Sequence, residues 1–226
     1  MTPGGENPAV KNLSQSDERV TPTASSTDVA RPVASARVPL MDPKRVYTTW
    51  GAKAERDVQA ILRSHVYVKG PHVSGFEEEF AAYVGTQHAV AVDSCTDALF
   101  LVLRAVLASR PEDRREVILP TFTFVATAGA VVNAGGVPVF ADVELDTMNI
   151  DPASVEQLVC GRTAAVVPVH LFGSIADLDG VRDAIKSAQM RMNGDGPSDV
   201  FVLEDAAQAI AATHDGRRAG ALADAG

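Results

Sequence analysis

The sequence has few cysteines, no long apolar run and no excess of positive charge. Its two cysteines, Cys95 and Cys160, are too few for a disulfide framework or a zinc site. No run of ~18 apolar residues occurs, and the N-terminus lacks the apolar core of a signal peptide. We therefore expect no membrane span and a cytoplasmic protein. A formal net charge of -9 argues against non-specific binding to nucleic acid or to anionic membranes.

Residues 1–45 are poor in the side chains that build a core. They hold six of the thirteen prolines, and no aromatic residue precedes Tyr47. Such a segment buries too little apolar surface to offset the entropy lost when it is ordered. We expect residues 1–45 to be a disordered tail and residues 46–226 to form the folded domain.

Helix and strand patterns alternate after Tyr47. A helix that ends at Gly85 is expected to start at the capping-box pattern of Ser74 and Glu77. Its aromatic side chains either stack on a ligand or, as we expect, pack on the core; they are Phe76, Phe80 and Tyr83. The alternation predicts an α/β fold with a mostly parallel sheet covered by helices. The expected strands cover 88–93, 116–119, 137–142, 164–170 and 200–204, and the other helices 53–65, 96–107, 127–133, 152–159 and 177–190.

Residues 93–99 join an expected strand to an expected helix through small polar side chains. Free amides at a helix N-terminus, together with the hydroxyls of Ser94 and Thr96, suit an anion such as phosphate. An ordinary helix cap explains the same pattern equally well. Cys95 counts against phosphate to some extent, because a glycine there would let a ligand come closer to the backbone.

Two further strand ends carry an aromatic ring or a histidine. In the loop over 120–127, Phe122 and Phe124 either stack on a planar cofactor or fill the core, and the general burial of phenylalanine favours the core. His170 ends the strand over 164–170 and is either a structural histidine, the commoner case, or a residue lining a site. No pattern of His, Cys and Glu supports a metal site.

The last expected strand ends in an acidic pair, Glu204 and Asp205, with an amide at Gln208. Ligands of open α/β sheets bind at the carboxyl ends of the strands. There, Asp205 would pair with a cationic ring nitrogen and Gln208 would bind a ring substituent. Alternatively, Asp205 only caps the turn that follows.

In order and spacing, these motifs resemble the DegT/StrS family of nucleotide-sugar aminotransferases, which bind pyridoxal 5'-phosphate on a fold-type-I scaffold. The resemblance runs from about Tyr47 to Gly226. It implies the large domain of that fold, a three-layer α/β/α structure with a mostly parallel sheet, here incomplete. It is carried by Tyr67-Val-Lys-Gly70, Phe76-Glu-Glu-Glu-Phe80, the Ser-x-Thr-Asp-Ala-Leu turn from Ser94, the Pro-x-x-Thr-Phe-x-Ala-Thr loop from Pro120, Phe140-Ala-Asp142, Asn149-Ile-Asp151, Val169-His-Leu-Phe-Gly173 and Glu204-Asp-Ala-Ala-Gln208.

The resemblance also implies a role for each site residue. Ser94, Cys95 and Thr96 match residues at the cofactor phosphate, with Thr96 the best side-chain candidate. Phe124 matches the residue that stacks on the pyridine ring. Asp205 and Gln208 match the residues at the ring nitrogen and the ring hydroxyl. Cys95 departs from the family pattern, in which glycine is usual.

A second departure concerns the family's Schiff-base lysine. The five lysines are Lys11, Lys44, Lys53, Lys69 and Lys186, and none matches it. The resemblance therefore implies that 46–226 is the N-terminal part of the large domain and that this chain alone is inactive. The complete enzyme would be a homodimer that moves an amino group from glutamate to a keto sugar nucleotide. Alternatives are a non-catalytic cofactor-binding or regulatory protein that pairs with a complete relative, and a dehydratase-like relative with histidine in place of the lysine.

Overall fold

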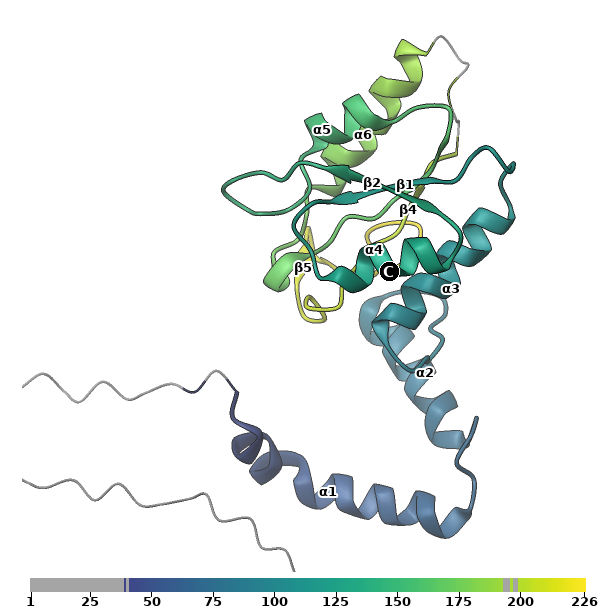
Figure 1. Cartoon of the computed structure of the whole chain (residues 1–226). Coiled ribbons are helices and arrows are strands. Elements are labelled where there is room, and N and C mark those ends of the chain that lie inside the picture. The colour runs from purple at the N-terminus through teal and green to yellow at the C-terminus, as the bar shows by residue number, and fades with distance from the viewer. Residues whose placement is uncertain (1–38, 40, 193–195, 197–198) are drawn as a thin grey trace, which may run out of the picture. The chain divides into compact units, whose positions relative to one another are not determined.

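The computed structural model describes residues 39, 41–192, 196 and 199–226 (Figure 1). The chain divides into two compact units, Met1–Asp57 and Val58–Gly226. The boundary falls inside helix α1, Pro43–Ser64. The predicted tail over 1–45 lies outside the described residues except for Pro39 and 41–45, so the tail stays a prediction.

Helix α1 begins ten residues before the helix that the sequence pattern predicts at 53–65. The Asp42 carboxylate accepts a hydrogen bond from the Arg45 amide at 3.0 Å, and Pro43 follows Asp42 directly. An acidic cap followed by proline is a helix start signal, since proline's fixed φ suits the first turn and its missing N–H leaves no donor unpaired. Val46, Tyr47 and Trp50 continue the helical spacing of apolar residues N-terminal to Lys53, so the expected start at 53 was too late.

The larger unit is built on a four-stranded parallel sheet in the order β2-β1-β3-β4. This confirms the expected α/β class. Strand β1 pairs along its whole length with β2, from Glu116 opposite Val137 to Pro120 opposite Ala141. The strands are β1 (Glu116–Pro120), β2 (Val137–Ala141), β3 (Thr163–Val166) and β4 (Phe201–Val202).

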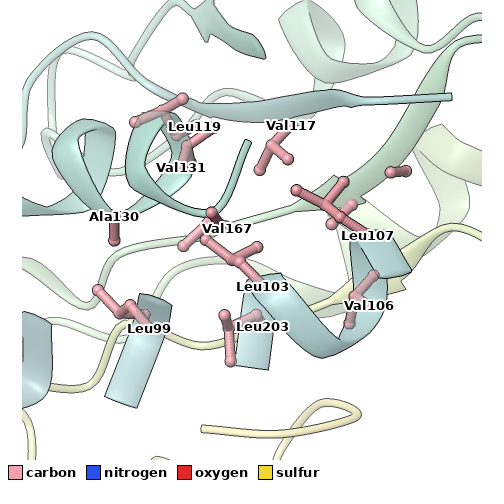
Figure 2. Close-up of a cluster of buried hydrophobic side chains, with 13 residues drawn as sticks. Leu99, Leu103, Val106, Leu107, Val117, Leu119, Ala130, Val131, Val167 and Leu203 are labelled. Carbon is pink, nitrogen blue, oxygen red and sulfur yellow. The ribbon is translucent and has the colours of Figure 1, made fainter. Parts of the chain in front are cut away.

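Helices cover both faces of this sheet, as alternate residues of β1 show. Val117 and Leu119 belong to a buried cluster with residues of α3 and α4 (Figure 2), whereas Ile118 belongs to a second cluster with residues of α5 and α6. Because successive side chains of a strand point to opposite faces, the two clusters lie on the two sides of the sheet. The expected three-layer arrangement is therefore confirmed. The helices are α3 (Cys95–Ala108), α4 (Val125–Asn133), α5 (Pro152–Leu158) and α6 (Leu178–Arg191).

Helix α2 (Pro71–Val84) corrects the predicted capping box. The helix starts three residues before Ser74, with Gly70 in the cap position and proline in the first turn. Ser74 is thus an interior helical residue. The Glu77 carboxylate instead accepts a hydrogen bond from the Ala91 amide at 2.9 Å. The predicted end is confirmed, because Gly85 closes the helix with a left-handed φ of 93°.

The aromatic face of α2 is not packed on the core, contrary to the sequence expectation. Phe76 and Tyr83 remain 55% and 43% exposed within the described structure. The rings stack along the helix, with 5.4 Å between the centroids of Phe76 and Phe80. The Arg218 guanidinium lies 4.2 Å from the centre of the Tyr83 ring. These aromatic rings therefore contact one another and the Arg218 guanidinium, and not the buried core.

The strand expected at 88–93 is absent from the described structure. Val90 is 79% exposed. An alternating apolar pattern forms a strand only where a neighbouring strand offers backbone donors and acceptors. No described strand pairs with this segment, so that prediction was wrong.

The remaining elements lie near the carboxyl ends of the strands or on the surface. A short 3-10 turn, η1 (Leu171–Gly173), contains Phe172 at φ 54°. A two-stranded antiparallel hairpin joins β5 (Thr213–His214) to β6 (Arg217–Arg218). No helix within the described residues is long and apolar enough to cross a membrane.

Candidate functional site

A cavity of about 230 Å³ lies at the carboxyl ends of the strands. The side chains that line it follow β1, β3 and β4 in the chain or belong to the first two turns of α3. Parallel strands bring their carboxyl ends to one edge, so segments distant in sequence meet here. The wall includes Cys95, Thr96, Thr123, Phe124, Thr127, His170, Asp205 and Gln208.

Asp205 supplies a buried carboxylate to this wall. The residue is 6% exposed, and its backbone amide bonds to the Pro168 carbonyl at 2.9 Å. Its Oδ2 accepts a hydrogen bond from Thr127 Oγ1 at 2.8 Å, and its Oδ1 accepts from the Ala207 amide at 3.3 Å. Among the residues that the structure describes, no basic side chain forms an ion pair with it. A buried anionic acceptor without a cation suits a positively charged partner in the cavity.

Cys95 contacts the same carboxylate. Its Sγ lies 3.7 Å from Asp205 Oδ1. Cys95 is exposed as a residue, but partial burial of its thiol first, and then the charge and hydrogen bond of Asp205, raise the pKa of the thiol to about 11. The thiol therefore stays protonated at neutral pH and acts as a weak donor. The resemblance implies that Cys95 lies at the cofactor phosphate; in the structure its thiol contacts the Asp205 carboxylate, and the phosphate role stays a prediction.

Ser94 and Thr96, both expected at a phosphate, have different positions at the start of α3. Ser94 caps the helix, since its hydroxyl accepts from the Asp97 amide at 3.2 Å and donates to the Asp97 carboxylate at 2.7 Å. Ser94 is not part of the cavity wall, whereas Thr96 is. Ser94 therefore caps α3 while its contact with a phosphate stays a prediction, and the N-terminal end of α3 meets the cavity at Cys95 and Thr96.

Phe124 and Gln208 lie on the cavity wall, as candidate ligand contacts require. Phe124 is 74% exposed and occupies the cap position of α4, so it does not fill the core. The Gln208 Oε1 accepts a hydrogen bond from the Phe172 amide at 2.8 Å. Because the carbonyl is used in this way, the NH₂ group of Gln208 is the part left to donate to a ligand.

His170 lines the cavity and is also held from behind. Its Nδ1 accepts a hydrogen bond from the Ala176 amide at 3.1 Å, so the proton lies on Nε2, which is 2.9 Å from Glu204 Oε2. Both side chains are fully buried. His170 thus combines the two roles that the sequence left open, a structural histidine and a residue of the cavity wall.

Glu204 contacts His170 without lining the cavity, and sequence analysis assigned no role to it. Its carboxylate accepts backbone hydrogen bonds from Gly220, Leu222 and Ala223 at 2.7–2.8 Å. Burial raises its pKa, but the hydrogen bonds from His170 and from these three amides outweigh burial, and the net pKa is lowered. The sequence offered one signal for this role, a carboxylate at the end of an apolar strand. Such a group is buried only where several hydrogen-bond donors surround it.

Thr127 and Thr123 were also missed as individual site residues. Their hydroxyl oxygens lie 3.0 Å apart, and Thr127 is 1% exposed. Thr123 lies in the loop before the Phe124 cap of α4, and Thr127 lies in the first turn of the helix, so the pair joins the loop to the helix. Within the described residues, no group of three or more His, Cys, Asp or Glu side chains is arranged to hold a metal ion.

Comparisons with known proteins agree with this architecture. A relative from Streptomyces venezuelae, dTDP-3-amino-3,4,6-trideoxy-alpha-D-glucose transaminase, is 40% identical over 185 residues, which are 82% of this chain and 45% of the relative. The crystal structure of S. venezuelae DesV in complex with ketimine intermediate has a TM-score of 0.71 at 40% identity and covers 83% of this chain and 47% of that chain. The structure of Escherichia coli GDP-4-keto-6-deoxy-D-mannose-3-dehydratase with bound hydrated PLP has a TM-score of 0.65 at 26% identity, over 75% of this chain and 42% of that chain.

The chain thus spans less than half the length of these relatives. The similarity to solved structures and the parallel sheet confirm the expected fold-type-I α/β class. The family model for the DegT/DnrJ/EryC1/StrS aminotransferases matches residues 49–226. This chain therefore belongs to the DegT/DnrJ/EryC1/StrS aminotransferase family.

Proposed function

We propose that the cavity binds pyridoxal 5'-phosphate and that residues 46–226 form the N-terminal part of the large domain of an aminotransferase. The observation that carries the proposal is the buried Asp205 carboxylate, which faces the cavity and, among the described residues, has hydroxyl, thiol and amide donors but no cationic partner. A protonated pyridine nitrogen is a planar cation with one N–H donor, so it matches this acceptor.

The other donors of the wall fit the same group. The NH₂ of Gln208 suits a ring hydroxyl, and Phe124 offers a face for stacking on the ring. Thr96 and the N-terminal end of α3 suit the phosphate, since helix N-termini favour anions. When bound, pyridoxal phosphate supplies an electron sink for chemistry at the carbon that bears the amino group.

We further propose the substrate class. The 40% identical relative from S. venezuelae is named as a transaminase of a dTDP-linked amino sugar, which supports a keto sugar nucleotide as the amino acceptor. Glutamate is the proposed amino donor, and a homodimer the proposed assembly of the complete enzyme. The neighbour named as a dehydratase shows that proteins of this fold also carry out another reaction on a keto sugar nucleotide. The cofactor assignment holds for both reactions.

The cofactor assignment is tested by removing either the ring nitrogen of the ligand or the carboxylate of Asp205. The 226-residue protein is titrated with pyridoxal phosphate and with its 1-deaza analogue, in which the ring nitrogen is replaced by CH, and binding is followed by absorbance. We expect the unmodified protein to prefer pyridoxal phosphate by about tenfold, as for a charge-assisted hydrogen bond. Asp205→Asn should abolish this preference. Equal affinity of the unmodified protein for both compounds would rule out the proposed role of Asp205.

Asp146→Asn is a matched control, because Asp146 is an exposed turn residue that does not line the cavity. It should keep the full preference. Thermal unfolding followed by circular dichroism shows whether each variant is folded.

We also propose that these 226 residues bind the cofactor non-covalently and do not transaminate alone. The lysines in the described part of the chain are Lys44, Lys53, Lys69 and Lys186, and none lines the cavity. A lysine amine is the group that forms a covalent imine with an aldehyde cofactor. Non-covalent binding is also what the alternative function, a non-catalytic cofactor-binding partner, requires.

Borohydride reduction tests this point. The protein is incubated with one equivalent of pyridoxal phosphate, reduced, digested and mapped by mass spectrometry. We expect only scattered adducts that are equally abundant in Asp205→Asn. A single modified lysine in the unmodified protein that disappears in Asp205→Asn would contradict the proposal, since it would show covalent capture from the cavity.

A further inference from the structure

We propose that Thr127 is a positioning residue that fixes the Asp205 carboxylate so that one of its oxygens is held by the protein and the other has capacity left for the ligand. This inference rests on the proposed cofactor site. It adds a residue that acts on the cofactor only through Asp205.

The contact between the two side chains is buried and short. Thr127 is 1% exposed, and its Oγ1 lies 2.8 Å from Asp205 Oδ2. Thr127 belongs to the first turn of α4, where its amide bonds to the Phe124 carbonyl at 3.1 Å. A β-branched side chain in a helix has few accessible rotamers. The hydroxyl is therefore held in place by the helix and not by the ligand.

The direction of the hydrogen bonds follows from the chemistry of the partners. An ionised carboxylate only accepts, so the Thr127 hydroxyl proton is donated to Asp205. The Thr127 oxygen is then free to accept from Thr123 Oγ1, 3.0 Å away. The resulting chain runs from Thr123 through Thr127 to Asp205, and each donor strengthens the next.

The two carboxylate oxygens of Asp205 therefore have different hydrogen-bond partners. Oδ2 is occupied by Thr127, whereas Oδ1 accepts from the Cys95 thiol at 3.7 Å and the Ala207 amide at 3.3 Å. Cys95, Ala207 and Thr127 all line the cavity, so the lengths of the hydrogen bonds distinguish the two oxygens. The two donors on Oδ1 are long and weak, so Oδ1 is the oxygen with capacity left for a ligand. A cationic N–H meets a carboxylate that is already oriented, which lowers the entropic cost of pairing.

The test uses the same pair of ligands, because their ratio isolates the ring nitrogen. Thr127→Val keeps the shape of the side chain and removes the hydroxyl. We expect it to reduce the preference for pyridoxal phosphate over the 1-deaza analogue from about tenfold to about twofold. Thr127→Ser restores the hydroxyl and should keep at least half of the preference. Thr123→Val leaves the hydroxyl in place but removes its donor, and should lower the preference about twofold.

Thr163→Val is the matched control. Thr163 is also fully buried and its Oγ1 also accepts a hydrogen bond, from the Cys160 amide at 3.0 Å, but it lies outside the cavity wall. This variant should be destabilised like Thr127→Val and yet keep the tenfold preference.

Two results would overturn the positioning role. One is an unchanged preference in Thr127→Val, and the other is an equal loss of affinity for both ligands, which is the signature of a merely structural residue. If the unmodified protein and Asp205→Asn behave as proposed, either result rejects only the role of Thr127. If the unmodified protein binds both compounds equally, the role of Asp205 is rejected, and if it binds neither compound, the cofactor assignment itself is rejected. Should Thr127→Val fail to fold, an unchanged preference in Thr123→Val would reject the hydroxyl chain.

Discussion

At the residue scale, the chemistry of the cavity depends on how Cys95 and Thr127 share one carboxylate. Cys95 lies against Asp205 from the N-terminal end of α3, and Thr127 approaches from α4. The thiol is the weaker donor and contacts the oxygen that has capacity left for a ligand. A ligand N–H therefore competes with the thiol of Cys95 and not with the hydroxyl of Thr127.

The raised pKa of Cys95, about 11, gives a direct prediction. The thiolate is the form that reacts with iodoacetamide, so alkylation should stay slow at pH 8 and rise steeply only toward pH 11. Rates are measured against pH in a Cys160→Ala background, so that Cys95 is the remaining cysteine. Asp205→Asn should move the profile to lower pH, because it removes a negative charge, but only part of the way, because burial is the largest cause of the shift. A profile with its midpoint near 9.0, the ordinary value, would show that this environment is wrong.

At the element scale, signals from neighbouring residues predicted most helix ends well. The strand prediction that failed depended on contacts between residues far apart in the sequence. Helices α3 and α5 start within one residue of the expected positions 96 and 152, at caps formed by Ser94 and Asp151, because a cap needs only a few neighbouring residues. The same reasoning failed at Ser74, where Gly70 and Pro71 start the helix earlier. The strand expected at 88–93 failed for a different reason, since pairing depends on residues far away in sequence.

Glu204 connects several elements and gives an element-scale prediction. Its carboxylate joins the end of β4 to His170 and to the amides of Gly220, Leu222 and Ala223. Its folded-state pKa is lowered, so the stabilisation is present above the unfolded value of about 4.5 and is lost as pH falls through the lower folded value. We expect the urea midpoint to fall between pH 6 and pH 4, and more steeply below pH 4.

Glu204→Gln supplies the comparison for this pH dependence. The uncharged amide presents an NH₂ to backbone donors, so we expect a loss of about 2–3 kcal/mol at pH 6. The variant should also lose part of the acid sensitivity. Asp146→Asn, in an exposed turn, is the control. An unchanged pH dependence in Glu204→Gln would mean that other carboxylates cause the acid unfolding.

At the scale of the whole molecule, the sequence predicted the class of fold but not the geometry of the site. Alternating helix and strand patterns indicated a parallel sheet, and that topology places the segments after β1, β3 and β4 at one edge. Asp205 was predicted from its position at the end of a strand. Its contacts with Cys95, 110 residues away, and with Thr127, 78 residues away, have no local signal. Distances of this kind follow only from the packed structure.

The backbone at Phe172 has a consequence for the rim of the cavity. Phe172 has a left-handed φ of 54°, a conformation that costs a residue with a side chain about 1–2 kcal/mol. The residue is 78% exposed, so burial of its side chain offsets little of this cost. The corner is held instead by two side-chain carbonyls, Gln208 Oε1 on the Phe172 amide and Asn149 Oδ1 on the Leu171 amide. These hydrogen bonds therefore join the segments that carry Leu171 and Gln208 into the cavity wall, at a backbone position whose strain they offset.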